Sequence, residues 1–237
     1  RRLAANGLTV VATARSAEKL AALAATAAPG RIVALAGDTT DASRMAEIVA
    51  TIEAAHGGLA LAVLNAGIYE PVDGEAPDLS SFERQIAVNL NGTVNCLVPA
   101  IAAMRARRRG QIAIVSSVAG YSGLPKAAAY GATKAALINM AESLKFDLDH
   151  EGILLQLVCP GFVDTPATAT NPFEMPFLME VEAAAAKLAE GLGTSRFEIT
   201  FPRAFTWQLK AMRALPYWAY FPLLARATGW NRKGRKA

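Results

Sequence analysis

Tyr130 and Lys134 are the two residues whose types and spacing are best suited to proton-transfer chemistry. They stand four positions apart in a stretch with a helical pattern, so both side chains project from one face of the helix. A lysine ammonium near a phenol stabilises the phenolate and lowers its pKa toward the range of a general acid or base. Pairs of this kind also occur on ordinary amphipathic helices, so the spacing alone does not define a catalytic site.

The elements that would position these residues alternate between short strands and longer helices. Apolar or β-branched runs predict strands at residues 8–13, 32–36, 59–64, 111–115, 153–158 and 197–201. Helical patterns cover residues 17–28, 42–56, 79–107 and 127–150, with Ser16 and Asp41 as predicted N-caps of the first two. This alternation predicts an α/β fold with a parallel sheet and helices on both of its faces.

Small and polar residues concentrate just after the predicted strands. In open parallel sheets, ligands bind beyond the carboxyl ends of the strands, near the switch point of strand order. The residues found there are Ala14-Arg15, Gly37-Asp38, Asn65-Ala66-Gly67, Ser116-Ser117 and Pro160-Gly161. We therefore predict the functional site at this edge of the sheet.

Several of these blocks together resemble the classical short-chain dehydrogenase/reductase family, over a stretch from Leu8 to about Thr165. The resemblance implies a Rossmann-like, doubly wound parallel sheet and an oxidoreductase that moves a hydride between a nicotinamide cofactor and a carbonyl compound or alcohol. The blocks are Asn65-Ala66-Gly67, Asn89 within residues 88–92, Ser116 to Gly120, Tyr130 to Lys134, and Pro160 to Thr165.

By this resemblance, four residues form the catalytic set. Tyr130 is the proton donor or acceptor, and Lys134 lowers its pKa and hydrogen-bonds the nicotinamide ribose. Ser117, thirteen residues before Tyr130, polarises the substrate oxygen. Its neighbour Ser116 is the competitor, since only one of two adjacent serines can face the cleft. Asn89 would anchor a proton-relay water, although a buried amide satisfied by local hydrogen bonds is the structural alternative.

The same resemblance predicts NADP as the cofactor, with NAD less favoured. NAD-specific relatives place an acid where Ala14 stands, whereas Arg15 could pair with a 2′-phosphate. Asp38 would bind the adenine, or serve only as a turn residue. Further cofactor contacts are expected from Asn65, Ala66, Gly67, Tyr130, Lys134, Pro160, Gly161, Val163 and Thr165, and no metal ligands are predicted.

The family opens with a strand and a TGxxxGxG loop that cradles the pyrophosphate, and nothing in this sequence matches them. Residues 1–7 instead resemble the end of the following helix, with Gly7 as its C′ stop. We therefore expect the sequence to be truncated at its N-terminus. A molecule without that piece would have unpaired strand edges within the sheet, low stability and weak cofactor binding.

Residues 1–202 are expected to form one catalytic domain, and residues 203–237 a basic, aromatic extension. The formal net charge is +4, yet from Arg203 onward there are eight Lys or Arg and no acid, together with all three tryptophans. This extension either packs over the substrate cleft, through Leu209, Met212, Leu215, Trp218 and Phe221, or binds membranes peripherally. A nucleic-acid partner is not expected, because the remainder is net acidic and carries no such motif.

The remaining expectations concern partners and location. Cys96 and Cys159 lie in apolar runs typical of free buried thiols, which favours a reducing, cytoplasmic setting, and no leader or membrane-spanning run is expected.

Residues 166–182, including Phe173, fall where the family carries a substrate lid, and their apolar character favours a hydrophobic substrate or simple core packing. Members of the family that the sequence resembles pair their long helices, so the resemblance implies a homodimer or homotetramer. A non-catalytic nucleotide-binding protein of this fold is the alternative to an enzyme.

Overall fold

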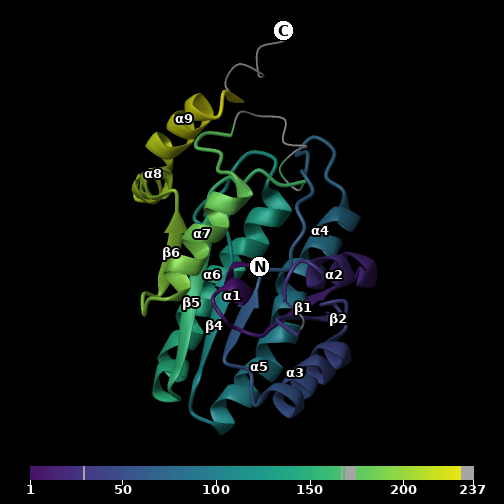
Figure 1. The fold of residues 1–237 in the computed structure, drawn as a ribbon. Helices are drawn as coiled ribbons and strands as arrows, with labels where there is room; N and C mark the ends of the chain where they lie inside the picture. The colour runs from purple at the N-terminus through teal and green to yellow at the C-terminus, as the bar shows by residue number, and fades with distance from the viewer. Residues whose placement is uncertain (29, 167, 169–174, 231–237) are drawn as a thin grey trace.

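A computed structural model describes residues 1–28, 30–166, 168 and 175–230 of the chain (Figure 1). Every described strand pairs in parallel with its neighbours. The strands are β1 (Val10–Ala14), β2 (Ile32–Ala36), β3 (Leu61–Leu64), β4 (Gly110–Val115), β5 (Ile153–Pro160) and β6 (Glu198–Phe201). Each begins and ends within two residues of its predicted bounds. The prediction of a parallel α/β fold is confirmed.

The strands form two sheets in the described part of the chain. One contains β1 and β2, and the other has the order β3-β4-β5-β6. The edges of β1 and β3 are not paired with each other, and a cavity of about 480 Å³ is lined by Val11 and Thr13 from the first and by Leu61 to Leu64 from the second. The interior of the fold is therefore open between its two sheets.

Helices cover both faces of the larger sheet (Figure 1). Ile112 and Ile114 of β4 point toward α5 and α6, while Ala113 and Val115 point toward α7. All four are buried, as expected for a parallel strand between two helical layers. The helices are α1 (Arg2–Ala5), α2 (Ala17–Ala24), α3 (Ala42–His56), α4 (Leu79–Gln85), α5 (Gly92–Ala106), α6 (Ala128–His150), α7 (Val181–Leu192), α8 (Arg203–Arg213) and α9 (Tyr217–Ala227).

The predicted helix ends are mostly confirmed. Ser16 Oγ accepts a hydrogen bond from Lys19 N at 3.2 Å, and Asp41 Oδ1 accepts one from Arg44 N at 2.9 Å. Gly7 follows α1 with a φ of 91°, the left-handed conformation that ends a helix. The second helix ends four residues earlier than predicted, at Ala24.

The predicted helix over residues 79–107 is not continuous. A π-helical segment, Ile86–Asn91, separates α4 from α5. The stretch Leu79–Arg107 is the one described helical stretch that meets the length and composition expected of a membrane span. Its α5 portion packs against α3 and its α4 portion against α6, as core helices of globular folds do.

The C-terminal extension forms α8 and α9, which lie beside β6 at the carboxyl end of the sheet (Figure 1). Leu209 is buried and Met212 lines a pocket there, in agreement with the packed interpretation. Trp218 and Phe221 were expected in the same contact, but they are 81% and 59% exposed. They are exposed because α9 turns Tyr220 and Leu224 inward in their place.

Candidate active site

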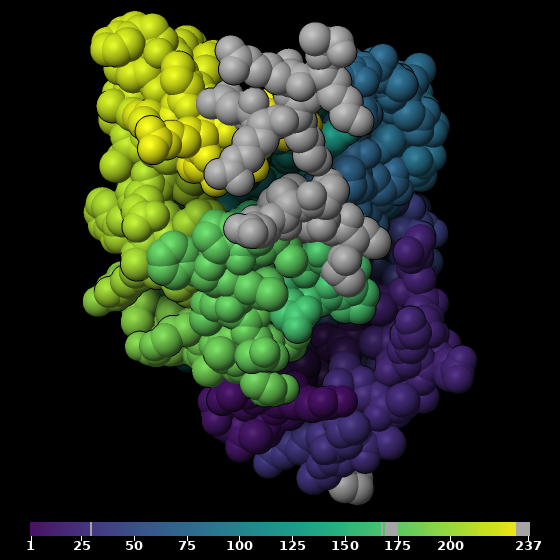
Figure 2. All heavy atoms as spheres, turned by 90° about the horizontal axis from the view of Figure 1, so that it is seen from above, coloured from purple at the N-terminus to yellow at the C-terminus, as the bar shows by residue number. Residues whose placement is uncertain are grey.

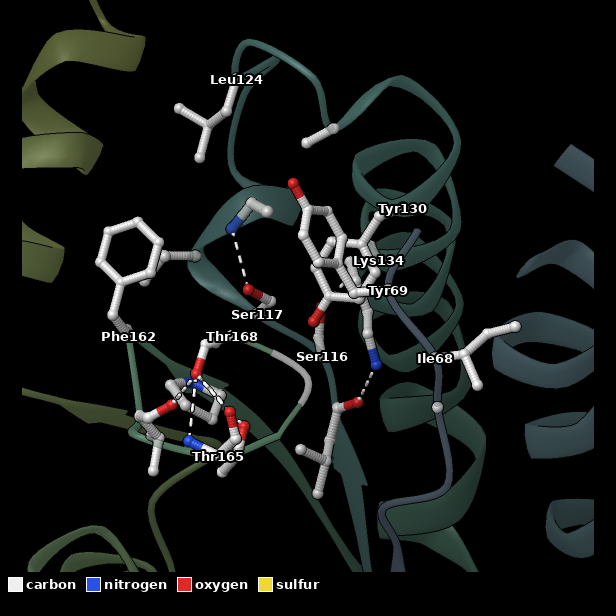
Figure 3. A pocket seen from close by; sticks show the side chains of 18 of the residues that line it. Ile68, Tyr69, Ser116, Ser117, Leu124, Tyr130, Lys134, Phe162, Thr165 and Thr168 are labelled. Atoms are coloured by element: carbon white, nitrogen blue, oxygen red, sulfur yellow. Dashed lines mark hydrogen bonds between the residues drawn. The ribbon is translucent and has the colours of Figure 1, made fainter. Parts of the chain in front are cut away.

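Two adjoining cavities lie at the carboxyl ends of the strands. The first cavity, of about 250 Å³, collects residues that follow β3, β4 and β5 together with two from α6 (Figure 3). The second cavity is the opening of about 480 Å³ between β1 and β3. Asn65, Gly67 and Ile68 line both cavities, so the chain after β3 forms their common wall.

The predicted site residues divide between these cavities with one exception. Asn89 lines neither cavity and is fully buried. Ala14, Arg15, Asp38 and Ala66 line the second cavity, Asn65 and Gly67 line both, and Ser117, Tyr130, Lys134, Pro160, Gly161, Val163 and Thr165 line the first.

Tyr130 and Lys134 lie together on the inner face of α6, as their spacing predicts (Figure 3). The Lys134 Nζ lies 5.6 Å from the centroid of the Tyr130 ring. It donates a hydrogen bond to the Val115 carbonyl at 2.9 Å, which fixes the ammonium at the end of β4. The Lys134 side chain is 3% exposed. The pair is therefore held in place before any ligand enters.

Burial controls the electrostatics of this pair. It lowers the pKa of Lys134 to about 8, because the charged ammonium loses its hydration. Burial also raises the pKa of Tyr130, and hydrogen bonding with Ser117 opposes that increase. Desolvation of the phenolate is therefore the larger effect on Tyr130 in this structure, and the lowering of its pKa by Lys134 stays a prediction.

The two adjacent serines have different partners. The Ser116 Oγ is buried and donates to the Lys134 carbonyl at 2.8 Å, which ties the end of β4 to α6. The Ser117 Oγ accepts from Ala119 N at 3.1 Å, beginning the short 3₁₀ helix Val118–Gly120 (η2). Ser117 is therefore the serine that lies beside Tyr130, with which it hydrogen-bonds, whereas the Ser116 hydroxyl is used in a structural hydrogen bond.

The Asn89 carboxamide is fully used by the protein. Its Oδ1 accepts from Ile68 N at 2.7 Å, and its Nδ2 donates to the Ile68 carbonyl at 2.9 Å and to Thr133 Oγ1 at 3.2 Å. This is the satisfied buried amide that we considered as the alternative. The side chain joins the π-helical segment to the wall between the cavities and to α6.

Gly67 is where that wall comes closest to the pair on α6. A Cβ at this position would lie 3.3 Å from Asn89 Oδ1 and 3.5 Å from Lys134 Nζ. The absence of a side chain leaves room for a ligand to pass along the wall from one cavity to the other. The residues present therefore fit an extended ligand such as a dinucleotide, with its ends in different cavities.

The far end of the second cavity carries Arg15 and Asp38. Asp38 Oδ1 accepts from both the amide and the hydroxyl of Thr40, each at 2.9 Å. These hydrogen bonds lower the pKa of Asp38, and the nearby Arg15 lowers it further. Asp38 therefore has the turn role that we weighed as its alternative, while Arg15 is exposed at the end of β1, one residue before the N-cap of α2.

Several residues that line the first cavity did not emerge from the sequence. Tyr69 packs edge-on against Tyr130, with ring centroids 5.1 Å apart. Its position two residues after Gly67 is the signal that could have found it. The others are Ile68, Leu124 and Ala127. Among the residues predicted as a lid, 167 and 169–174 lie outside the described part of the chain.

A doubly wound α/β fold with this cavity at the carboxyl ends of its strands is the architecture of nucleotide-dependent oxidoreductases. The sequence model of the short chain dehydrogenase family matches residues 1–174. An uncharacterized oxidoreductase of Myxococcus xanthus is 36% identical over 209 residues, which cover 87% of this chain and 81% of that protein. The chain therefore belongs to the short-chain dehydrogenase family.

Solved structures agree with this assignment. A short-chain dehydrogenase from Streptomyces avermitilis has a TM-score of 0.76 at 24% identity and covers 96% of this chain and 88% of its own, which shows the fold. A gluconate 5-dehydrogenase from Burkholderia cenocepacia, solved with NADP and tartrate, has a TM-score of 0.65 at 26% identity over 70% of this chain and 66% of its own. The chain spans 61 to 81% of the length of three curated relatives that it matches.

Proposed function

We propose that this protein transfers a hydride between NADP(H) and a hydrophobic carbonyl compound or secondary alcohol, with Tyr130 as the acid or base. The observation that carries the proposal is the convergence of Ser117, Tyr130 and Lys134 on one cavity that shares a wall with a second, larger one. Bound NADPH would supply the hydride, and NADP⁺ would accept it.

The chain's own residues would handle the proton. The hydroxyls of Ser117 and Tyr130 would hold the carbonyl oxygen, and Tyr130 would give its proton to that oxygen as the carbon accepts the hydride. Lys134, charged below a pKa of about 8, would stabilise the resulting phenolate. Tyr130 would then regain its proton from solvent, which restores the residue for the next turnover. For Asn89 we keep a positioning role, because its carboxamide holds Ile68 and α6 in place.

The preference for NADP rests on Ala14 and Arg15. Both line the second cavity, and the carboxylate that would repel a 2′-phosphate is absent at position 14. The Arg15 side chain is exposed, so its guanidinium is available to a phosphate. Similar folds solved with NADP or NADPH bound support the same choice.

The test is a panel of ketones, aldehydes and secondary alcohols, followed by NADPH absorbance. Tyr130→Phe should lower kcat by about 10²–10⁴-fold and leave the Kd for NADPH unchanged, because only the proton donor is lost. Tyr69→Phe is the matched control and should stay within about tenfold of wild type. Near wild-type turnover by folded Tyr130→Phe would refute the assignment. NADPH binding without turnover of any compound would favour the non-catalytic alternative.

We also propose self-association through the helices on one face of the sheet. Val98 on α5 and Phe146 on α6 are 61% and 74% exposed, and both helices cover the same sheet face. Large exposed apolar side chains on packed helices are typical of subunit interfaces. The occupant we propose is a second copy of this chain, giving a homodimer or homotetramer.

A second candidate role is peripheral binding to anionic membranes through α9. Its outward residues Tyr217, Trp218, Phe221 and Leu223 are 49 to 81% exposed. No acid occurs from Arg203 onward, so an anionic surface meets no repulsion there. Co-sedimentation with anionic vesicles at low salt is expected for the wild type and should be lost in Trp218→Glu. Protein that stays in the supernatant with such vesicles would rule the role out.

A further inference from the structure

A third cavity, the C-terminal chamber, lies between α8, α9 and the catalytic loop, which is defined as residues 121–127 between η2 and α6. It measures about 250 Å³ and takes most of its lining from α8, α9 and the segment around Pro176. Apart from Gln208 and Thr228, its lining side chains are apolar, and none carries a charge. The Thr228 hydroxyl already donates to the Leu224 carbonyl at 2.8 Å. Such a lining suits a hydrocarbon and disfavours an ionised group.

The C-terminal chamber borders the first cavity directly. Leu124, Pro125 and Phe162 line both, and in Figure 3 Leu124 and Phe162 stand on the side of the site away from Lys134 and Ile68. Each space alone, at about 250 Å³, is smaller than the roughly 300–1,000 Å³ of common ligand pockets. The combined volume of the two cavities, which meet at these three side chains, falls within that range. A molecule whose carbonyl meets Tyr130 would extend its other end across Phe162.

The helices that close the chamber are fixed to the catalytic loop. The Tyr220 hydroxyl of α9 donates to the Gly123 carbonyl at 2.8 Å, and Lys126 Nζ lies 5.8 Å from the centroid of the Trp230 ring. On α8, Lys210 pairs with Glu198, which accepts from the Tyr121 hydroxyl at 2.7 Å. Figure 2 shows the extension in yellow at one edge of the face that carries the strand ends. These contacts hold the chamber against the site as a fixed wall.

We propose that the C-terminal chamber binds the uncharged hydrocarbon tail of the substrate. The inference rests on the proposed function, and it names lipophilic ketones and secondary alcohols, with the reacting carbon near one end, as the substrate class. The family model matches only residues 1–174, so the chamber side chains from Phe205 to Trp230 lie beyond the region that defines the family. The extension would then set which tail the shared catalytic residues act upon.

The experiment measures kcat/KM for 2-alkanones from 2-butanone to 2-undecanone with the purified chain and NADPH. Each methylene that enters the chamber should raise kcat/KM by about fourfold, until the chamber is full. Ala227→Phe fills the chamber and should lower the ratio of 2-undecanone to 2-butanone activity at least tenfold, because the longer tail loses its space. The NADPH Kd of the variant checks that its cofactor site is intact. Ala211→Phe, on an exposed position of α8 outside the lining, is the matched control.

Met212→Ala provides the opposite change, because it enlarges the chamber and should move the optimum to longer tails. A wild type that reduces ketones without regard to length, or an Ala227→Phe variant with the wild-type length dependence, would overturn the proposal. Tail binding is measured separately by calorimetry of 2-undecanone with NADP⁺, which cannot reduce a ketone. Binding that Ala227→Phe weakens, without turnover by wild type and NADPH, would uphold the chamber and refute the proposed function. If the wild type neither binds nor reduces 2-undecanone, the proposal that the chamber binds the substrate tail is overturned.

Discussion

Burial of Lys134 imposes a cost on the folded protein that depends on pH. The folded state disfavours the ammonium, so the penalty is fully present below a pKa of about 8 and fades as the pH rises toward the ordinary lysine value of 10.5. Among the described residues the Lys134 ammonium donates to the Val115 carbonyl, and that single acceptor does not replace a hydration shell. A lysine whose pKa is lowered by burial in a cavity is typical of functional sites.

Lys134→Met should remove this pH dependence. Between pH 7.5 and 10, the free energy of unfolding of wild type should rise by roughly 2 kcal/mol relative to the variant. Urea denaturation at both pH values measures the difference. Lys145→Met, at a partly exposed lysine of the same helix, controls for loss of a lysine. Equal pH dependence in wild type and Lys134→Met would mean that the ammonium is hydrated in the folded state.

Cofactor selection should change with a single residue. Ala14→Asp places a carboxylate where a 2′-phosphate is expected, and the ratio of NADPH to NADH affinity should fall at least tenfold. Arg15→Ala should weaken NADPH binding and leave NADH binding within about twofold. Fluorescence titration of wild type and the two variants with both cofactors gives the six dissociation constants. Tighter binding of NADH than NADPH by the wild type would contradict the predicted preference.

Single residues were predictable from sequence where their spacing has one geometric meaning. Four positions on a helix bring Tyr130 and Lys134 to one face, and a residue that follows a strand must lie at the sheet edge. Side-chain partners were not predictable in this way. Nothing in the sequence separates Ser116 from Ser117 by burial, and the satisfied carboxamide of Asn89 depends on the exact path of residues 67 and 68.

At the scale of elements, the π-helical segment explains why a helical pattern over 79–107 does not give a single helix. It directs Asn89 at Ile68, and the Thr93 hydroxyl donates to the Asn89 carbonyl at 2.7 Å. Wide turns of this type occur often at functional sites. Hydrophobic periodicity cannot reveal one extra residue in a turn, because the apolar face continues on either side.

Asn89→Ala should therefore act on stability and on catalysis together. Loss of the carboxamide leaves the Ile68 amide and carbonyl without partners, which should lower the free energy of unfolding by roughly 1–3 kcal/mol. The turnover should fall as well, because Ile68 and Thr133 position the cavity wall and α6. Asn91→Ala, exposed on the same segment, is the control. Full turnover by a destabilised Asn89→Ala would show that Asn89 does not position the catalytic residues.

On the scale of the whole molecule, the sequence predicted the fold class, the strand bounds and unpaired edges within the sheet, which the described chain has between β1 and β3. The strand order was not predicted, because strand propensity is local, whereas pairing depends on which edges meet. The outer surface is likewise set by packing. Phe146 and Leu144 lie on the same helix, yet the first is 74% exposed and the second packs against the core.

Phe146→Glu tests the proposed subunit contact. Placing a charge on the exposed face of α6 should convert an oligomer into a monomer at micromolar concentration, because a buried unpaired carboxylate would oppose association. Light scattering measures the mass. Phe221→Glu, an exposed phenylalanine on α9, should leave the mass unchanged. A monomeric wild type, or an oligomeric Phe146→Glu protein, would contradict the proposed contact.

The three tryptophans all belong to the C-terminal extension: Trp207 on α8, Trp218 on α9 and Trp230 beyond it. Indole emission from this protein therefore arises entirely from the C-terminal extension, whereas circular dichroism samples every helix and strand. If the extension detaches before the sheets unfold, the two signals will give separate transitions. Because Trp230 lines the chamber and Trp218 is 81% exposed, an aqueous quencher and a hydrocarbon ligand will act on different parts of the same spectrum.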